Sequence, residues 1–127
     1  MQNQNTILIG DAAHLVDPWL GEGLYYALAS GQLAAKCIIE SEQNNDYEIS
    51  HYSEQIHSTL VPELAAARKL SLLINLLPLV NVLALKASPT LQQMIIDLLR
   101  GEISHTQLWK TLKKHFPKLI WKILRGK

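Results

Sequence analysis

The chain has 127 residues, 48% hydrophobic and 18% charged, which is typical of one folded domain and argues against intrinsic disorder. Its formal net charge is +1, but residues 103–127 carry seven bases and no acid, while residues 1–102 carry eleven acids and five bases. The one cysteine, Cys37, excludes a disulfide within the chain and a cysteine metal cluster. The N-terminal residues have neither the basic region nor the apolar core of a signal peptide, so we expect a cytoplasmic or peripheral membrane location.

The first predicted element is a short apolar strand at residues 7–9, which runs directly into the sequence Gly-Asp-Ala-Ala-His at residues 10–14. A loop with Asp17, Pro18 and the Gly-Glu-Gly of residues 21–23 follows, and then a long helical pattern. Glycines let the backbone approach a ligand closely, and the start of a helix offers unpaired N–H groups to negative charge. A strand, an acid at its end, a glycine loop and a helix together predict a site for a large polar ligand.

The predicted helix after Gly23 has large apolar residues along broadly one side and small alanines between them. The large ones are Leu24, Leu28, Leu33 and Ile38. Small residues allow a helix to pack tightly on a sheet. Gly31 inside the helix costs about 1 kcal/mol relative to alanine, so we expect a neighbouring element to approach closely there.

A second helix is predicted from about Tyr47, after a turn rich in acids and amides. Its apolar stripe consists of Ile49, Tyr52, Ile56 and Leu60. Pro62 is expected to kink this helix, or to end it and start another. Residues 63–77 are strongly helical, Pro78 breaks the pattern, and residues 79–87 form a further short helix.

The apolar window at residues 70–87 is long enough to suggest a membrane span. Several residues in it argue against a span, as does the lack of an aromatic belt. They are Asn75, Pro78, Asn81 and Lys86. A buried helical hairpin is therefore favoured.

Ser88 and Pro89 have the order of an N-cap and a first helical residue, and they predict a helix over 89–100 that Gly101 ends. Ser104 and Gln107 form a predicted capping box.

The capping box starts a helix of about residues 105–115, and Pro117 is expected to restart a last amphipathic turn. The basic tail interleaves Trp109 and Trp121 with lysines, which fits peripheral contact with a membrane surface. A solvated basic face explains it equally well, and the tail offers too little for nucleic-acid binding.

The opening stretch resembles the second flavin-binding segment of FAD-dependent oxidoreductases built like p-hydroxybenzoate hydroxylase, a group that includes the geranylgeranyl reductases. The matching residues are Gly10-Asp11-Ala12-Ala13, Asp17-Pro18, Gly21-Glu22-Gly23, Tyr25-Tyr26-Ala27-Leu28 and Ser30-Gly31. Looser matches follow in the family's order. They are Tyr47, Tyr52, Glu63-Leu64, Ala67-Arg68 and residues 101–104.

The resemblance implies a mostly α chain that forms the C-terminal fragment of an α/β, Rossmann-like FAD-binding flavoprotein. Residues 1–45 would be the last segment of the FAD-binding domain (strand, loop and helix), and residues 46–127 a helical C-terminal region. Such proteins hold the ADP half of FAD with a Gly-x-Gly-x-x-Gly fingerprint. The chain has no such fingerprint, so a missing N-terminal half is expected in cis or in trans.

In the family, the acid at the position of Asp11 holds a ribityl hydroxyl of FAD, and the proline-to-glycine loop lies beside the flavin ring. The resemblance thus assigns cofactor contacts to Gly10, Asp11, Ala12, Pro18, Gly21, Glu22 and Gly23. It implies NADPH as the reductant and an isoprenoid C=C bond as the substrate. The catalytic acid is not identified. A flavin-dependent hydroxylase (monooxygenase) and an inactive fragment or partner-dependent subunit are the alternatives.

Other polar residues have simpler explanations. His14 is more readily a histidine satisfied by a backbone partner in the loop than a proton donor, and Asp17 and Glu22 are more readily loop and cap residues. His51 and His57 are six residues apart on a helix and share no face well, so no metal site is expected.

Overall fold

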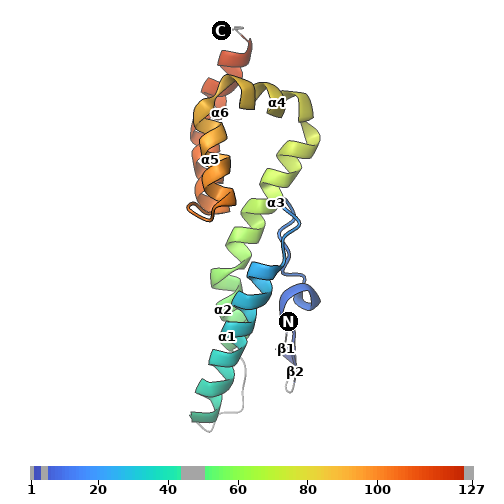
Figure 1. Cartoon of the computed structure of the whole chain (residues 1–127). Coiled ribbons are helices and arrows are strands. Elements are labelled where there is room, and N and C mark those ends of the chain that lie inside the picture. Colours follow the sequence, from blue (N-terminus) through green and yellow to red (C-terminus); the bar gives the residue numbers. More distant parts are fainter. Residues whose placement is uncertain (1, 4–5, 44–50, 125–127) are drawn as a thin grey trace. The chain divides into compact units, whose positions relative to one another are not determined.

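The computed structural model describes residues 2–3, 6–43 and 51–124, and these form a mostly helical chain, as predicted (Figure 1). The chain divides into two compact units, Met1–Ala65 and Ala66–Lys127, which we call the N-terminal and C-terminal units. The boundary predicted between residues 45 and 46 lies outside the described residues and stays a prediction.

The N-terminal unit begins with a minimal hairpin. Strand β1, Gln2–Asn3, pairs antiparallel with β2, Thr6–Ile7, and Gln2 lies opposite Ile7. The predicted strand at residues 7–9 is therefore shorter and begins earlier than expected. Leu8 and Ile9 are exposed and continue towards a single 3-10 turn, η1, Gly10–Ala13.

Helix α1, Leu24–Gln43, packs against η1 and against α2, His51–Thr59. The residues that α1 buries are one turn apart and mostly small: Tyr26, Ser30, Ala34 and Cys37. The small residues allow close packing, though on η1 and α2 and not on a sheet as expected. Of the predicted apolar side, Leu24, Leu28 and Ile38 are exposed, while Leu33 packs against the core. Leu24 is 69% exposed.

The close approach expected at Gly31 is absent, and that prediction is wrong. A Cβ built on Gly31 meets nothing within 4 Å. The adjacent Ser30 is instead the residue that lies against η1, because the Gly10 N–H donates to its Oγ at 2.9 Å.

Helix α2 buries Tyr52 and Ile56 completely, and Leu60 follows in the same core, which confirms the predicted stripe for its described members. The Tyr52 hydroxyl donates to the Leu8 carbonyl at 2.8 Å and so connects α2 to the segment before η1. Helix α2 ends before Pro62, which is the second residue of α3, Val61–Leu76. Pro62 therefore starts a new helix, one of the two outcomes expected for it.

The C-terminal unit holds the later part of α3 and the helices α4, Pro78–Ala87, α5, Pro89–Leu99, and α6, His105–Leu124. Helices α5 and α6 both pack against α4 and against each other. Among the residues of this unit whose burial the structure describes, the buried ones are Ala66, Ala67, Leu70, Ala84, Leu98, His105 and Leu108. None of the helices in the described part of the chain is both long and apolar enough to cross a bilayer.

The hairpin predicted at residues 70–87 forms a turn at Pro78, but it is not buried as expected. Leu76 and Leu79 are 75% and 79% exposed. The Asn81 side chain holds the turn together, since its Nδ2 donates to the carbonyls of Leu73 and Ile74 at 3.4 and 2.9 Å.

The predicted helix starts of this unit are confirmed. Ser88 Oγ accepts from the Leu91 N–H at 3.3 Å, and Pro89 is the first residue of α5. In the capping box, the Ser104 N–H donates to Gln107 Oε1 at 2.8 Å and the Gln107 N–H donates to Ser104 Oγ at 3.3 Å. Helix α6 differs from the expectation only in continuing through position 117, where a proline removes one backbone hydrogen bond without ending the helix.

Candidate functional site

Gly10 is fixed against helix α1 by its conformation and by its environment. Its φ is +52°, in the left-handed region that favours glycine. A Cβ at this position would lie 2.9 Å from the Ala27 Cβ and 3.2 Å from the Ala27 Cα. Its N–H donates to Ser30 Oγ, which in turn donates to the Tyr26 carbonyl at 2.6 Å. Gly10 therefore sets the distance between η1 and α1, and with it the place of Asp11.

Asp11 lies beside the first turn of α1, as its predicted role requires. Its Oδ1 is 2.7 Å from the point where a Cβ on Gly23 would stand, so the carboxylate occupies the space that a side chain at position 23 would need. The residue is exposed. Within the described residues, the carboxylate of Asp11 makes no hydrogen bond and no ion pair, so its oxygens are open to a ligand.

The loop before α1 is closed by its own backbone. The Gly21 N–H donates to the Asp17 carbonyl at 2.9 Å, and the Asp17 N–H donates to the Glu22 carbonyl at 3.0 Å. Gly21 has a φ of +71° and open space where a Cβ would be. Its amide is thus engaged within the loop, and a ligand could contact Gly21 only through its exposed backbone surface.

Asp17 and Glu22 serve as loop and cap residues, as expected. Asp17 is 2% exposed, and its Oδ1 accepts from the N–H groups of Trp19 and Leu20 at 2.7 and 3.0 Å. This is the Asx-turn arrangement. Glu22 Oε1 accepts from the Tyr25 N–H at 2.9 Å and satisfies one of the first amides of α1.

Two amides at the start of α1 remain available. Ala27 makes the first backbone bond of the helix, to the Gly23 carbonyl at 2.8 Å. The N–H groups of Gly23 and Leu24 donate no hydrogen bond in the part of the chain that the structure describes. They lie at the positive end of the helix dipole, where an acceptor or a negative charge on a ligand is favoured.

The remaining predicted residues lie around this point. Ala12 and Pro18 are exposed. His14 closes η1, because its backbone N–H donates to the Asp11 carbonyl at 2.9 Å. His14 has a φ of 58°, which is uncommon for a residue with a side chain. Its backbone is satisfied within the loop, and its imidazole is on the exposed side.

Two tyrosines follow at the helix start. The rings of Tyr25 and Tyr26 pack edge to face, with centroids 5.2 Å apart. Burial raises the pKa of the Tyr26 hydroxyl well above its ordinary value, and the negative charge of Asp17 raises it further. Tyr26 therefore stays neutral, while Tyr25 is exposed beside the free amides.

Ser30 has no predicted role in the sequence, although its hydroxyl joins η1 to α1. A serine inside a helix, twenty residues after the glycine that begins η1, is a weak signal. Gly31, where a close approach was predicted, has only open space in place of a side chain.

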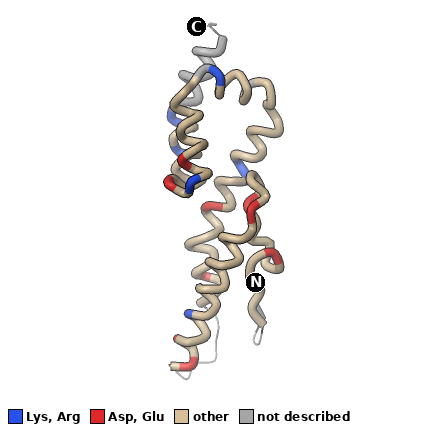
Figure 2. The backbone as a smooth tube through the Cα atoms, viewed as in Figure 1, with Lys and Arg blue, Asp and Glu red and all other residues tan. Residues whose placement is uncertain are grey.

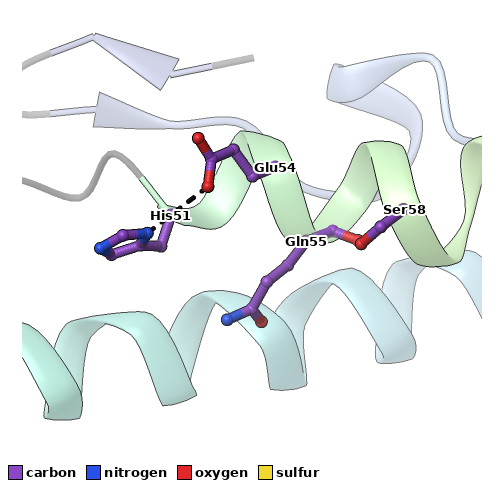
Figure 3. Close-up of polar contacts among 4 residues, drawn as sticks. All are labelled: His51, Glu54, Gln55 and Ser58. Atoms are coloured by element: carbon purple, nitrogen blue, oxygen red, sulfur yellow. Dashed lines mark hydrogen bonds and ion pairs between the residues drawn. The ribbon is translucent and has the colours of Figure 1, made fainter.

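The histidines of α2 lie elsewhere. His51 Nδ1 is 3.5 Å from Glu54 Oε2, and both side chains are exposed on α2 (Figure 3). Among the described residues, no group of three or more metal-binding side chains comes together.

Comparison with known proteins finds partial similarity to several enzymes. The chain is 32% identical over 113 residues to 1H-pyrrole-2-carbonyl-(peptidyl-carrier protein) chlorinase of Pseudomonas fluorescens, a match that covers 85% of this chain and 24% of that protein. It is 34% identical over 65 residues to the chloroplastic geranylgeranyl diphosphate reductase of Arabidopsis thaliana, a match that covers 47% of this chain and 14% of that protein. It is 46% identical over 41 residues to digeranylgeranylglycerophospholipid reductase of Thermoplasma acidophilum, a match that covers 32% of this chain and 10% of that protein.

No protein-family model matches the chain, and no solved structure matches it. The chain spans about a quarter of the length of the chlorinase and less of the two reductases. These partial similarities support the general family of oxidoreductases that the opening motif resembles, and they do not single out one activity.

Proposed function

We propose that this chain supplies the flavin-ring side of an FAD-dependent oxidoreductase. The observation that carries the proposal is the place of the Asp11 carboxylate, exposed and unpaired against Gly23 at the start of α1. A hydroxyl of a polyol chain is a natural donor to such a carboxylate. The free amides of Gly23 and Leu24 would then donate to the electron-rich edge of the ring.

The described residues fit this cofactor. An acceptor (Asp11) and two donors (the amides of Gly23 and Leu24) lie together, and the loop beside them carries exposed backbone at Gly21 and an exposed ring at Pro18. Ala12 lies next to Asp11, Gly10 holds this segment on α1, and Glu22 caps the helix. When bound, FAD would supply two-electron redox chemistry, while these residues would bind and orient it.

The finer proposal is reduction of isoprenoid C=C bonds with NADPH as the electron source. Two of the relatives reported above carry the name of a reductase of geranylgeranyl compounds. The opening motif, with Tyr25-Tyr26 and Ser30-Gly31 after the glycine loop, resembles the reductases more than the hydroxylases.

An oxygen-dependent flavin enzyme is the second candidate. The relative whose match covers 85% of this chain is named a chlorinase, not a reductase. Oxygen separates the two candidates. A reductase converts its substrate under anaerobic conditions, whereas a hydroxylase or a halogenating enzyme needs oxygen.

The rest of the enzyme would come from further chain in cis or from a partner in trans. The side of α1 that carries Leu24, Tyr25 and Leu28 is exposed in the N-terminal unit and would offer an apolar surface to that part. The absence of a Gly-x-Gly-x-x-Gly fingerprint supports the same division of roles. The chain purified alone is then expected to bind no FAD.

The experiment joins this chain in frame to the dinucleotide-binding portion of the Thermoplasma reductase and purifies it beside the unjoined chain. The proposal predicts flavin absorbance in the joined protein only, and anaerobic consumption of NADPH with geranylgeranyl diphosphate. Flavin binding with turnover only in oxygen would favour the second candidate. A joined and folded protein without flavin would contradict the proposal as a whole.

A further inference from the structure

Helix α4 carries an exposed apolar stripe that ends in a lysine. Leu79, Val82, Leu83 and Lys86 are spaced at i, i+3, i+4 and i+7, so they share one face of the helix. All four are exposed, while Ala84 is buried in the C-terminal unit. A solvent-facing helix side would ordinarily be polar.

The last turns of α3 repeat this pattern in the opposite direction. Lys69, Leu72 and Leu76 are spaced at i, i+3 and i+7 and are all exposed. Both stripes run towards the break at Leu77 and Pro78, and each has its lysine at the far end. We call the six exposed apolar residues the α3–α4 corner: Leu72, Leu76, Leu77, Leu79, Val82 and Leu83.

Part of the backbone at this corner is already paired. The Leu77 N–H donates to the Leu73 carbonyl at 3.2 Å, and the Asn81 N–H donates to the Leu77 carbonyl at 3.0 Å. The Asn81 Nδ2 donates to the Ile74 carbonyl at 2.9 Å and to the Leu73 carbonyl at 3.4 Å. These bonds lower the cost of bringing the helix break to the boundary of a bilayer, where the uncapped first amides of α4 can still bond to water or to head groups.

Charge around the corner has one sign. No acid occurs between Glu63 and Asp97, so α3 beyond its first turn and α4 show no red in Figure 2. The C-terminal unit holds eleven lysines and arginines against two acids, a net charge of +9 with histidine neutral. The N-terminal unit holds one base against nine acids, or −8.

We propose that the α3–α4 corner inserts into the interface of an anionic lipid bilayer. The leucines and valine would enter the boundary between head groups and acyl chains, and Lys69 and Lys86 would extend to the phosphates at the edge. The surplus of positive charge in this unit would draw it to anionic lipid. The contact is thus assigned to a helical corner and not to the basic tail alone, and it does not depend on the flavin proposal.

The test measures partition of the full chain into phosphatidylcholine vesicles with and without phosphatidylserine. Binding is expected with phosphatidylserine and is expected to weaken with salt. The double variant Leu79→Ser/Leu83→Ser is expected to lower the partition constant about thirtyfold. The matched control Ile38→Ser/Ile39→Ser removes two exposed apolar side chains from the acidic unit and leaves the partition constant unchanged.

A second variant, Leu79→Trp, reports insertion directly, because its fluorescence shifts to the blue and is quenched by brominated acyl chains. No binding to anionic vesicles, equal losses in the two double variants, or an unshifted Leu79→Trp emission would each overturn the proposal. A concentration-dependent dimer that Leu79→Ser/Leu83→Ser abolishes, without vesicle binding, would assign the corner to a second copy instead.

Discussion

The Oδ1 of Asp11 stands 2.7 Å from the point where a Cβ on Gly23 would be built. Residues twelve positions apart thus share one small space at the start of α1. The carboxylate is exposed and flexible at its end, so an added methyl would displace it and would not disrupt the core. Position 23 therefore controls where the carboxylate lies.

Gly23→Ala is expected to keep the fold and to move the Asp11 carboxylate away from the helix start. The free energy of unfolding should change by no more than about 0.5 kcal/mol, as is usual for surface substitutions. Flavin affinity of the joined protein should fall about tenfold, the equivalent of one lost hydrogen bond to a charged group. Urea denaturation and flavin titration measure the two effects separately, and a large loss of stability with normal flavin binding would contradict this account.

Gly10→Ala is expected to lower the free energy of unfolding by about 2–4 kcal/mol. Alanine would be strained by the left-handed backbone conformation at this position. Its Cβ would also lie 3.2 Å from the Ala27 Cα, which cannot move aside easily. Gly31→Ala is the matched control, because open space surrounds that position in the middle of α1. It should stabilise the protein by about 0.5–1 kcal/mol. Equal effects of the two substitutions in urea denaturation would show that η1 does not pack on α1 as described.

Ser30→Ala should destabilise the protein by about 1–3 kcal/mol, since it leaves the buried Gly10 N–H without an acceptor. The control is Ser58→Ala on α2, where an exposed hydroxyl donates to the Gln55 carbonyl at 3.1 Å (Figure 3). That substitution should change the free energy of unfolding by less than about 0.5 kcal/mol. If thermal denaturation shows that Ser30→Ala lowers stability no more than Ser58→Ala does, the role given to Ser30 is refuted.

Tyr26 should make the fold sensitive to alkali. Burial, and then the charge of Asp17, raise the pKa of its hydroxyl in the folded protein. The unfolded chain releases this proton at about pH 10. Above that pH the unfolded state binds fewer protons than the folded state, so the free energy of unfolding falls as pH rises. The stabilisation is complete below about pH 10. Tyr26→Phe should flatten this alkaline fall in denaturant titrations from neutral to alkaline pH, and parallel curves for the two proteins would contradict it.

Local signals in the sequence were sufficient where one or two neighbouring residues decide the structure. The capping box of Ser104 and Gln107, the N-cap at Ser88 and the loop and cap roles of Asp17 and Glu22 all appear as predicted. Each depends on a side chain reaching a backbone N–H two or three residues away, and such contacts need no knowledge of the rest of the fold.

Packing was harder to predict, because it depends on which surfaces meet. Helix α1 has large apolar residues on one side and small residues on another. Only the structure shows that Ser30 and Ala34 are buried while Leu24 is exposed. The leucines near Pro78 likewise suggested a buried hairpin, whereas Leu76 and Leu79 face outward. Hydrophobicity alone does not say which apolar face finds a neighbour within the same chain.

The candidate site was predictable as a set of residues but not in its detail. The motif pointed to Asp11 and Gly23, and the structure brings them together. The engagement of the Gly21 amide with the Asp17 carbonyl was not foreseen, because it depends on the exact path of the loop.

The affinity of the joined protein for FAD, measured for Asp11→Ala against the wild type, tests the central claim most directly. Glu42→Ala, which removes an exposed carboxylate at the far end of α1, is the control. We predict that Asp11→Ala weakens FAD binding by about tenfold or more, as expected for a lost hydrogen bond to a charged group, and that Glu42→Ala leaves it unchanged. Equal FAD affinity in the wild type and in Asp11→Ala would contradict the assignment of this carboxylate to the flavin.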